Sequence, residues 1–152
     1  MQWLDGSRID IKQYSGEMLC EKLADEMWAY DIKEWLKCAE FIQTACFLIA
    51  FDTELAMEGI WTFLENDLGQ YAQPIIQAFR AVGAQKEADT LEAICQYAPP
   101  DIRREKFLAG AYEDDTAVEE AVERLAEKLY LYTNFDIWSL LYRYLDEQIA
   151  LA

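Results

Sequence analysis

Carboxylates at helical spacing are the side chains of this chain best suited to do chemistry. Glu54 and Glu58 are four residues apart, and Glu119, Glu123 and Glu127 repeat the same interval. Residues four apart share one face of an α-helix, so each set can present its carboxylates together. Such sets could bind Mg²⁺ or Ca²⁺, or they could form a solvated acidic face.

The absence of histidine removes most catalytic arrangements. Histidine is the commonest general base and metal ligand, and the Ser-His and Cys-His nucleophile pairs depend on it. Di-metal sites in helical bundles draw on Glu-x-x-His motifs. Gly59, Gly69 and Gly83 form no phosphate-binding loop. We therefore expect a protein that is not an enzyme, with no catalytic residue, no metal site and no cofactor.

The charge of the chain is large and patterned. There are 29 Asp and Glu against 13 Lys and Arg, a formal net charge of −16 over 152 residues. Basic residues are missing from two windows, Lys37 to Arg80 and Lys106 to Arg124. The acidic residues there that we expect to contact a partner are Asp52, Glu54, Glu58, Glu65, Asp67, Glu113, Asp114, Asp115, Glu119, Glu120 and Glu123. Such a surface repels nucleic acid and anionic membrane and attracts basic proteins.

An acidic protein could compete with DNA for a basic partner by placing carboxylates where phosphates sit, but the carboxylates of one helix are more widely spaced than the phosphates of a duplex. Four residues of helix rise about 6 Å, whereas duplex DNA carries one charge per about 1.7 Å of its axis. Several elements would therefore have to contribute carboxylates. The alternative is that the acids only keep the protein in solution.

The composition is that of a folded protein with reduced cysteines. The chain is 53% hydrophobic and contains five Trp, nine Tyr and seven Phe, which excludes disorder. The amino terminus lacks a signal-peptide pattern, and no apolar run is long enough to span a membrane. Without a Cys-x-x-Cys pair, the cysteines are expected to be buried thiols in a cytoplasmic protein. They are Cys20, Cys38, Cys46 and Cys95.

Helical periodicity throughout the chain predicts an all-α fold, a single domain over residues 1–152 with seven or eight helices. Ser15 and Asp31 are expected to cap the first two helices, which would run to about Tyr30 and Ala56. Later helices are expected at about 58–65, 71–83, 84–97, 101–110, 114–132 and from 136 onward. Four tryptophans fall on or beside apolar stripes and are expected to pack in the core. They are Trp28, Trp35, Trp61 and Trp138.

The segment from Glu54 to Ala72 resembles the signature of the bacterial DNA mimic protein-nineteen family. In that signature an acidic residue, a turn and an aromatic-rich helix precede Asn, Gly and Tyr-Ala. Met57-Glu58-Gly59 stands where Asn-Gly-Gly is usual. The matching residues are Glu54, Gly59, Ile60, Phe63, Leu64, Asn66, Gly69, Tyr71 and Ala72. The similarity covers about residues 35–147. It implies an all-helical acidic protein, and the best-known type of the family occupies the DNA-binding surface of a transcription factor.

Three functions remain open from the sequence. The first is a DNA mimic that binds a basic partner, such as a repressor or nucleoid protein, and binds neither nucleic acid nor membrane itself. The second is an immunity-type or assembly protein that binds one partner through apolar anchors, with charge serving solubility. The third is a carboxylate-metal hydrolase. The oligomeric state is not determined, and a homodimer is one alternative.

Overall fold

Helices make up nearly all of the regular structure. The computed structural model describes residues 1–98, 116–130 and 136–152, which contain eight α-helices and no β-strand. The helices are α1 Gly16–Glu26, α2 Ile32–Trp35, α3 Glu40–Glu58, α4 Ile60–Glu65, α5 Ala72–Ala81, α6 Gln85–Tyr97, α8 Thr116–Glu127 and α10 Ile137–Leu151. Three 3₁₀ turns accompany them, η1 Ile11–Gln13, η2 Met27–Ala29 and η3 Asp67–Tyr71. The all-α prediction is confirmed, whereas the helix expected at 101–110 lies outside the described residues.

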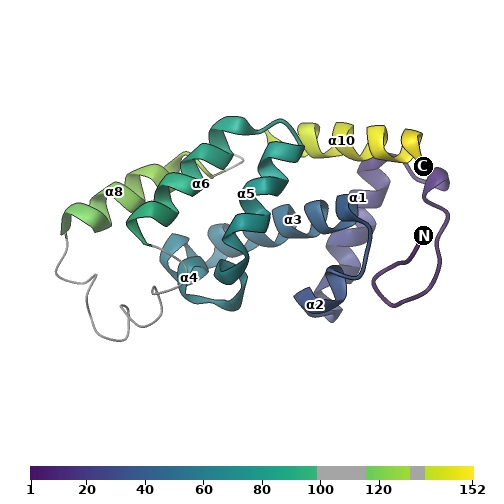
Figure 1. The fold of residues 1–152 in the computed structure, drawn as a ribbon, viewed down its shortest axis with the longest axis horizontal. Helices are drawn as coiled ribbons and strands as arrows, with labels where there is room; N and C mark the ends of the chain where they lie inside the picture. Colours follow the sequence, from purple (N-terminus) through teal and green to yellow (C-terminus); the bar gives the residue numbers. More distant parts are fainter. Residues whose placement is uncertain (99–115, 131–135) are drawn as a thin grey trace.

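The molecule is built around α3. Every residue of this helix from Thr44 to Phe51 is buried, so it needs cover on all sides. The helices α1, α2, α4, α5 and α10 supply that cover. In Figure 1, α3 runs through the middle of the molecule, α1 and α10 lie toward the two termini, and α4 and α8 lie toward the opposite end. No helix in the described residues is long and apolar enough to cross a membrane.

Aromatic contacts fix the neighbours of α3. The Phe51 ring meets Phe63 of α4 and Phe79 of α5 edge to face, with centroids 4.9 and 5.6 Å apart. Phe47 packs against Trp35 and against Tyr71, the last residue of η3. Edge-to-face pairs add to the free energy of burial because they are directional. The two edge-to-face pairs of Phe51 therefore hold α4 and α5 against α3, and the tilted contact between Phe47 and Tyr71 holds η3 there.

The expectation of one helix from Asp31 to Ala56 is wrong. The chain leaves the helix after α2 and re-enters it at Glu40, and the Asp31 side chain makes no capping hydrogen bond. The amide of Gln43 donates to the carbonyl oxygens of Leu36 and Cys38, at 3.3 and 2.8 Å. These bonds satisfy carbonyls that an interrupted helix leaves exposed. Neither Gly nor Pro marks the break, so the sequence pattern gave no sign of it.

Other boundaries follow the sequence signals. Ser15 accepts a hydrogen bond from the backbone N–H of Met18, which confirms it as the cap of α1. Gly59, with φ of +85°, separates α3 from α4, and Gly83, with φ of +90°, follows α5. Only glycine adopts such angles without strain. Because α3 continues to Glu58, Glu54 and Glu58 share one helix face, as the spacing predicts.

The contact between α1 and α10 yields a first prediction. Asp146 of α10 accepts a hydrogen bond from the Gly16 N–H at 2.6 Å, and a Cβ on Gly16 would collide with the Tyr142 carbonyl oxygen. Because that oxygen belongs to the backbone, Gly16→Ala must push the helices apart, and we expect a loss of about 1–3 kcal/mol in the free energy of unfolding. Urea denaturation measures it. The neighbouring change Glu17→Ala, at an exposed site of α1, is the control, and equal stability of the two variants would contradict the packing described.

Candidate functional site

Three carboxylates lie near one another at the C-terminal end of α3. Glu54 and Glu58 lie one turn apart on that helix, and both Glu58 and Asp67 of η3 act electrostatically on Glu54. The side-chain amide of Asn66 donates to the Glu54 carboxylate at 2.5 Å and so joins the start of η3 to α3. We call Glu54, Glu58 and Asp67 the α3-end cluster.

The α3-end cluster is held together against its own repulsion. Partial burial raises the pKa of Glu54, the hydrogen bond from Asn66 opposes the rise, and the charges of Glu58 and Asp67 add to it. Within the described residues, none of the three carboxylates has a Lys or Arg within ion-pair distance. Like charges at this spacing cost stability. A positively charged partner would relieve that cost, so the cluster is suited to binding one.

An apolar hollow of about 200 Å³ adjoins the cluster. Its walls come from the α1–α2 connection, from α2, from the end of α3 and from η3. Large apolar side chains line the hollow, among them Trp28, Ile32, Met57 and Leu68, and Glu54 and Glu58 line it as well. Trp28 is 53% exposed and Met57 is 75% exposed, although both are large hydrophobic side chains. Exposed apolar groups gathered beside charged ones are typical of sites that bind other proteins.

Trp28 is exposed, so the prediction that it packs in the core is wrong. Its helical spacing predicted a core residue, but it stands at the surface, with its indole N–H donating to the Ala24 carbonyl at 2.7 Å. The prediction holds for Trp35, which is buried and donates to Met27 O, and for Trp61 and Trp138, which pack against the core. Trp28 lies in the turn η2, which follows α1, and its neighbour Met27 is the residue of that turn that is buried.

Other acids of the first window lie apart from the cluster. Asp52 is two residues before Glu54 and therefore about 200° around the helix from it. It is half-buried, it has no hydrogen-bond or ion-pair partner among the described residues, and burial raises its pKa. Glu65 is exposed at the end of α4.

The second window is only partly described. Glu120 and Glu123 are exposed on α8 and Glu119 is half-buried there, while Glu113, Asp114 and Asp115 lie outside the described residues. Two helices separate α8 from α3, because α8 packs on α6, α6 on α5 and α5 on α3. The described parts of the two windows thus stand on different elements toward one end of the molecule (Figure 1).

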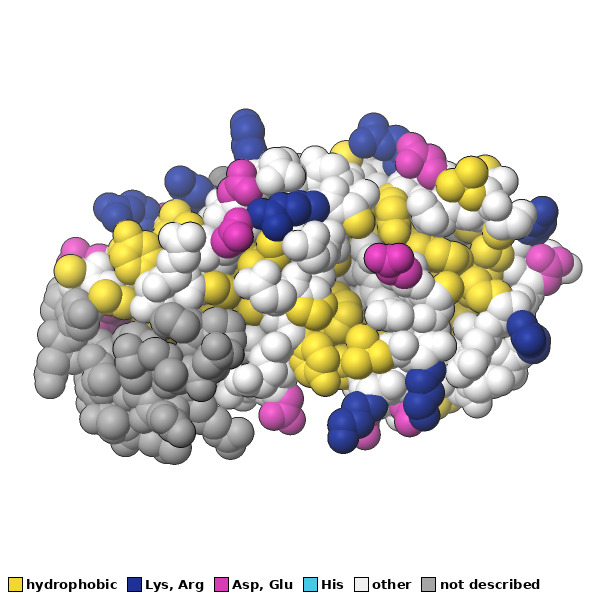
Figure 2. All heavy atoms as spheres, in the orientation of Figure 1, with side chains coloured by type: hydrophobic (Ala, Val, Ile, Leu, Met, Phe, Trp, Pro, Cys, Tyr) yellow, Lys and Arg dark blue, Asp and Glu magenta, His cyan; other side chains and the backbone are white. Residues whose placement is uncertain are grey.

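One side of α8 is basic. Lys86 of α6 and Arg124 and Lys128 of α8 line a groove of about 450 Å³, together with Glu87 and Glu127. Figure 2 shows Lys and Arg side chains along the upper edge of the molecule, where Figure 1 places α6 and α8. The second window therefore belongs to a helix of mixed charge, unlike the α3-end cluster.

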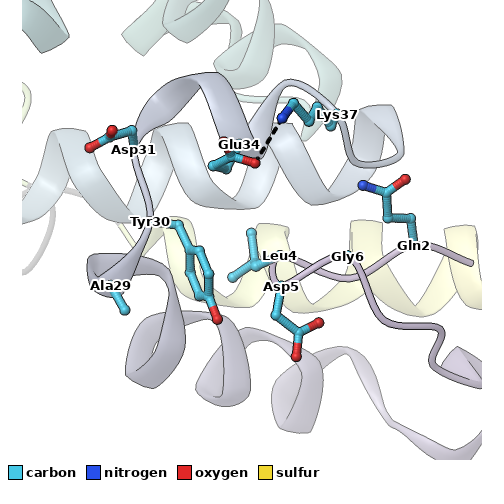
Figure 3. Close-up of a pocket in the computed structure, with 9 residues that line it drawn as sticks. All are labelled: Gln2, Leu4, Asp5, Gly6, Ala29, Tyr30, Asp31, Glu34 and Lys37. Atoms are coloured by element: carbon cyan, nitrogen blue, oxygen red, sulfur yellow. Dashed lines mark hydrogen bonds and ion pairs between the residues drawn. The ribbon is translucent and has the colours of Figure 1, made fainter.

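Two further hollows lie beside α2. One of about 600 Å³ is lined by Ile32, Trp35 and Tyr71, with Lys33 and Asp67, and Figure 2 shows hydrophobic side chains gathered between α2 and the start of α5. The other, about 410 Å³, is drawn in Figure 3. Two of the three carboxylates that line it, those of Asp5 and Glu34, already have partners within the chain.

In the hollow of about 410 Å³, the Glu34 carboxylate pairs with the Lys37 ammonium at 3.0 Å (Figure 3), and Asp5 accepts a hydrogen bond from the Ser7 N–H. Hydrogen bonds from Ser7 lower the pKa of Asp5. The hollow therefore offers less uncompensated charge than the α3-end cluster.

The thiols are buried, as predicted. Cys20, Cys38, Cys46 and Cys95 are free and buried. Burial raises the pKa of Cys20 to about 12 and also raises the pKa of Cys38 and Cys46, which keeps these thiols protonated and unreactive. In the part of the chain that the structure describes, no three His, Cys, Asp or Glu side chains are grouped so as to hold a metal ion.

Comparison with known proteins identifies the family. A protein-family model described as DMP19-like protein matches residues 37–148. The chain belongs to the DMP19-like protein family. Membership implies a protein of the DNA-mimic type, and the matched range agrees with the resemblance seen in the sequence. No curated protein and no solved structure gives a significant match to the chain.

Asp52 supplies a prediction that depends on pH. Burial raises its pKa above the ordinary 3.8, so the ionised form costs the folded state free energy. That cost is absent below pH 3.8 and complete once the pH exceeds the raised pKa. We therefore expect Asp52→Asn to be more stable than wild type at pH 7 and the difference to vanish as the pH falls toward 3.8.

Urea midpoints at the two pH values measure this difference. The same change at exposed Asp25 is the matched control and should leave the midpoints nearly unchanged. If Asp52→Asn were no more stable than wild type at pH 7, the burial described for Asp52 would be contradicted.

Proposed function

We propose that this protein is a non-enzymatic binding module whose carboxylates occupy the basic, DNA-binding surface of a transcription factor or nucleoid protein. The observation that carries the proposal is the α3-end cluster, where two elements bring three carboxylates together without a compensating cation in the described residues. The net charge of −16 and membership of the DMP19-like family support it.

The cluster answers the objection that one helix is too sparse to imitate DNA. Glu54 and Glu58 alone would place charges about 6 Å apart. Asp67 lies on η3 and adds a third charge from outside the helix. The cluster thus presents charges from two elements, just as duplex DNA presents phosphates from two strands. We propose that Glu65, Glu119, Glu120 and Glu123 extend this surface, with Glu113, Asp114 and Asp115. Asp52 should contribute least, because it faces away from Glu54 on α3.

A second candidate function rests on the exposed Trp28 and Met57. An immunity-type or assembly protein would bind one specific partner through such apolar anchors, and the charge would then serve solubility. The two functions differ in their response to salt. Binding by exposed charges weakens steeply as salt screens them, whereas apolar anchoring does not.

Neutralising the cluster tests the proposal. The variant Glu54→Gln/Glu58→Gln/Asp67→Asn removes three charges, and Gln at position 54 can still accept the hydrogen bond from Asn66. The control Glu17→Gln/Glu21→Gln/Glu147→Gln removes three exposed charges from α1 and α10. Both triple variants carry a net charge of −13, that is −16 plus 3.

Capture of basic proteins from the native cell extract, with elution by graded salt, is the measurement. We expect the cluster variant to release its partner at clearly lower salt than wild type, and the control to behave as wild type. Equal shifts for the two variants would mean that only net charge matters. Unchanged elution of the cluster variant, or elution that ignores salt, would favour apolar anchoring instead.

A further inference from the structure

The hollow beside the α3-end cluster combines an apolar floor with negative walls. Ile32, Met57 and Leu68 supply the apolar part, and Glu54 and Glu58 also line the hollow. Its volume of about 200 Å³ is below the roughly 300–1,000 Å³ of pockets that bury drug-sized ligands. It is therefore suited to one long side chain.

Trp28 gives the hollow a ring held in a fixed position. The ring is 53% exposed, but its N–H is already bonded to the Ala24 carbonyl at 2.7 Å, so the indole has no need of another hydrogen-bond partner. Its π face is the part left for binding. A surface ring that is held in this way loses little conformational entropy when a partner packs on it.

We propose that the hollow binds an arginine side chain from the basic surface of the partner. The methylene stem would lie on Met57 and Leu68, and the guanidinium would stack on Trp28 and donate to the carboxylates of Glu54 and Glu58. Arginine suits this arrangement because its planar group stacks on aromatic rings and bonds carboxylates in a two-pronged fashion. This inference rests on the proposed function and names the chemistry at its centre.

Other occupants fit the hollow less well. An anionic group would add to the repulsion that already acts on Glu54. A purely apolar side chain would cover two carboxylates without pairing them, which costs free energy. A lysine ammonium is more strongly hydrated than a guanidinium and cannot stack as a plane, so it should bind more weakly.

A peptide titration tests the inference without the natural partner. The probe is a short end-blocked peptide of alternating Gly and Arg, and matched peptides carry Lys or uncharged citrulline in place of Arg. The NMR signals of the Trp28 indole N–H and the Met57 methyl group report on the hollow. We expect saturable shifts of both with the Arg peptide, weaker binding of the Lys peptide and none of the citrulline peptide.

Two variants locate the binding. Trp28→Ala should weaken binding of the Arg peptide by roughly 3- to 30-fold, the range of a cation–π contact. Met57→Ala should also weaken it, because the methylene stem of the arginine loses the side chain it packs on. Met18→Ala is the control for Met57→Ala, because Met18 is 51% exposed on α1 and does not line the hollow. Circular dichroism checks that each variant is folded. Equal binding of the Arg and Lys peptides, or Arg binding that leaves the two signals unmoved, would overturn the proposal.

The two proposals can fail separately. If the cluster variant loses its natural partner while Trp28→Ala and Met57→Ala retain it in full, the function stands and the arginine hollow is wrong. If the Arg peptide binds in the hollow but the cluster variant retains its partner, the hollow stands and the proposed function is wrong.

Discussion

The burial of α3 is the constraint on which the rest of the structure depends. A helix with every residue from Thr44 to Phe51 buried is stable only when neighbours exclude water from its whole circumference. The rings around Phe47 and Phe51 recruit α4, η3 and α5 to that task, and α1 and α10 complete it. The middle of α3 holds no charge, so the acids of this helix, apart from half-buried Asp52, stand at its two ends.

This arrangement connects the core to the proposed binding surface. The packing of Tyr71 on Phe47 and the burial of Leu68 set the position of η3, and η3 in turn brings Asn66 and Asp67 to Glu54. The repulsion among the three carboxylates is modest because the charges are exposed to water. The free energy that burial of the core contributes to folding offsets this repulsion. The exposed Trp28 depends on the same core, because Met27 beside it is fully buried and anchors the turn η2.

Much of the fold could be predicted from the sequence because its signals are local. The Ser15 cap and the glycine after α5 both act within a few residues. The break between α2 and α3 could not be predicted, since the Gln43 side chain replaces the usual Gly or Pro. The pairing of Glu54 with Glu58 follows from spacing alone. The approach of Asp67 to Glu54 depends on tertiary packing, which periodicity does not encode.

Competition with DNA tests the central claim most directly. A basic protein captured by this chain is bound to a fluorescent DNA duplex, and the polarisation of the label is followed as the chain is added. The account predicts that wild-type chain releases the duplex in full and that the variant Glu54→Gln/Glu58→Gln/Asp67→Asn does so only at much higher concentration. A ternary complex of duplex, basic protein and chain, with the duplex still bound, would contradict it.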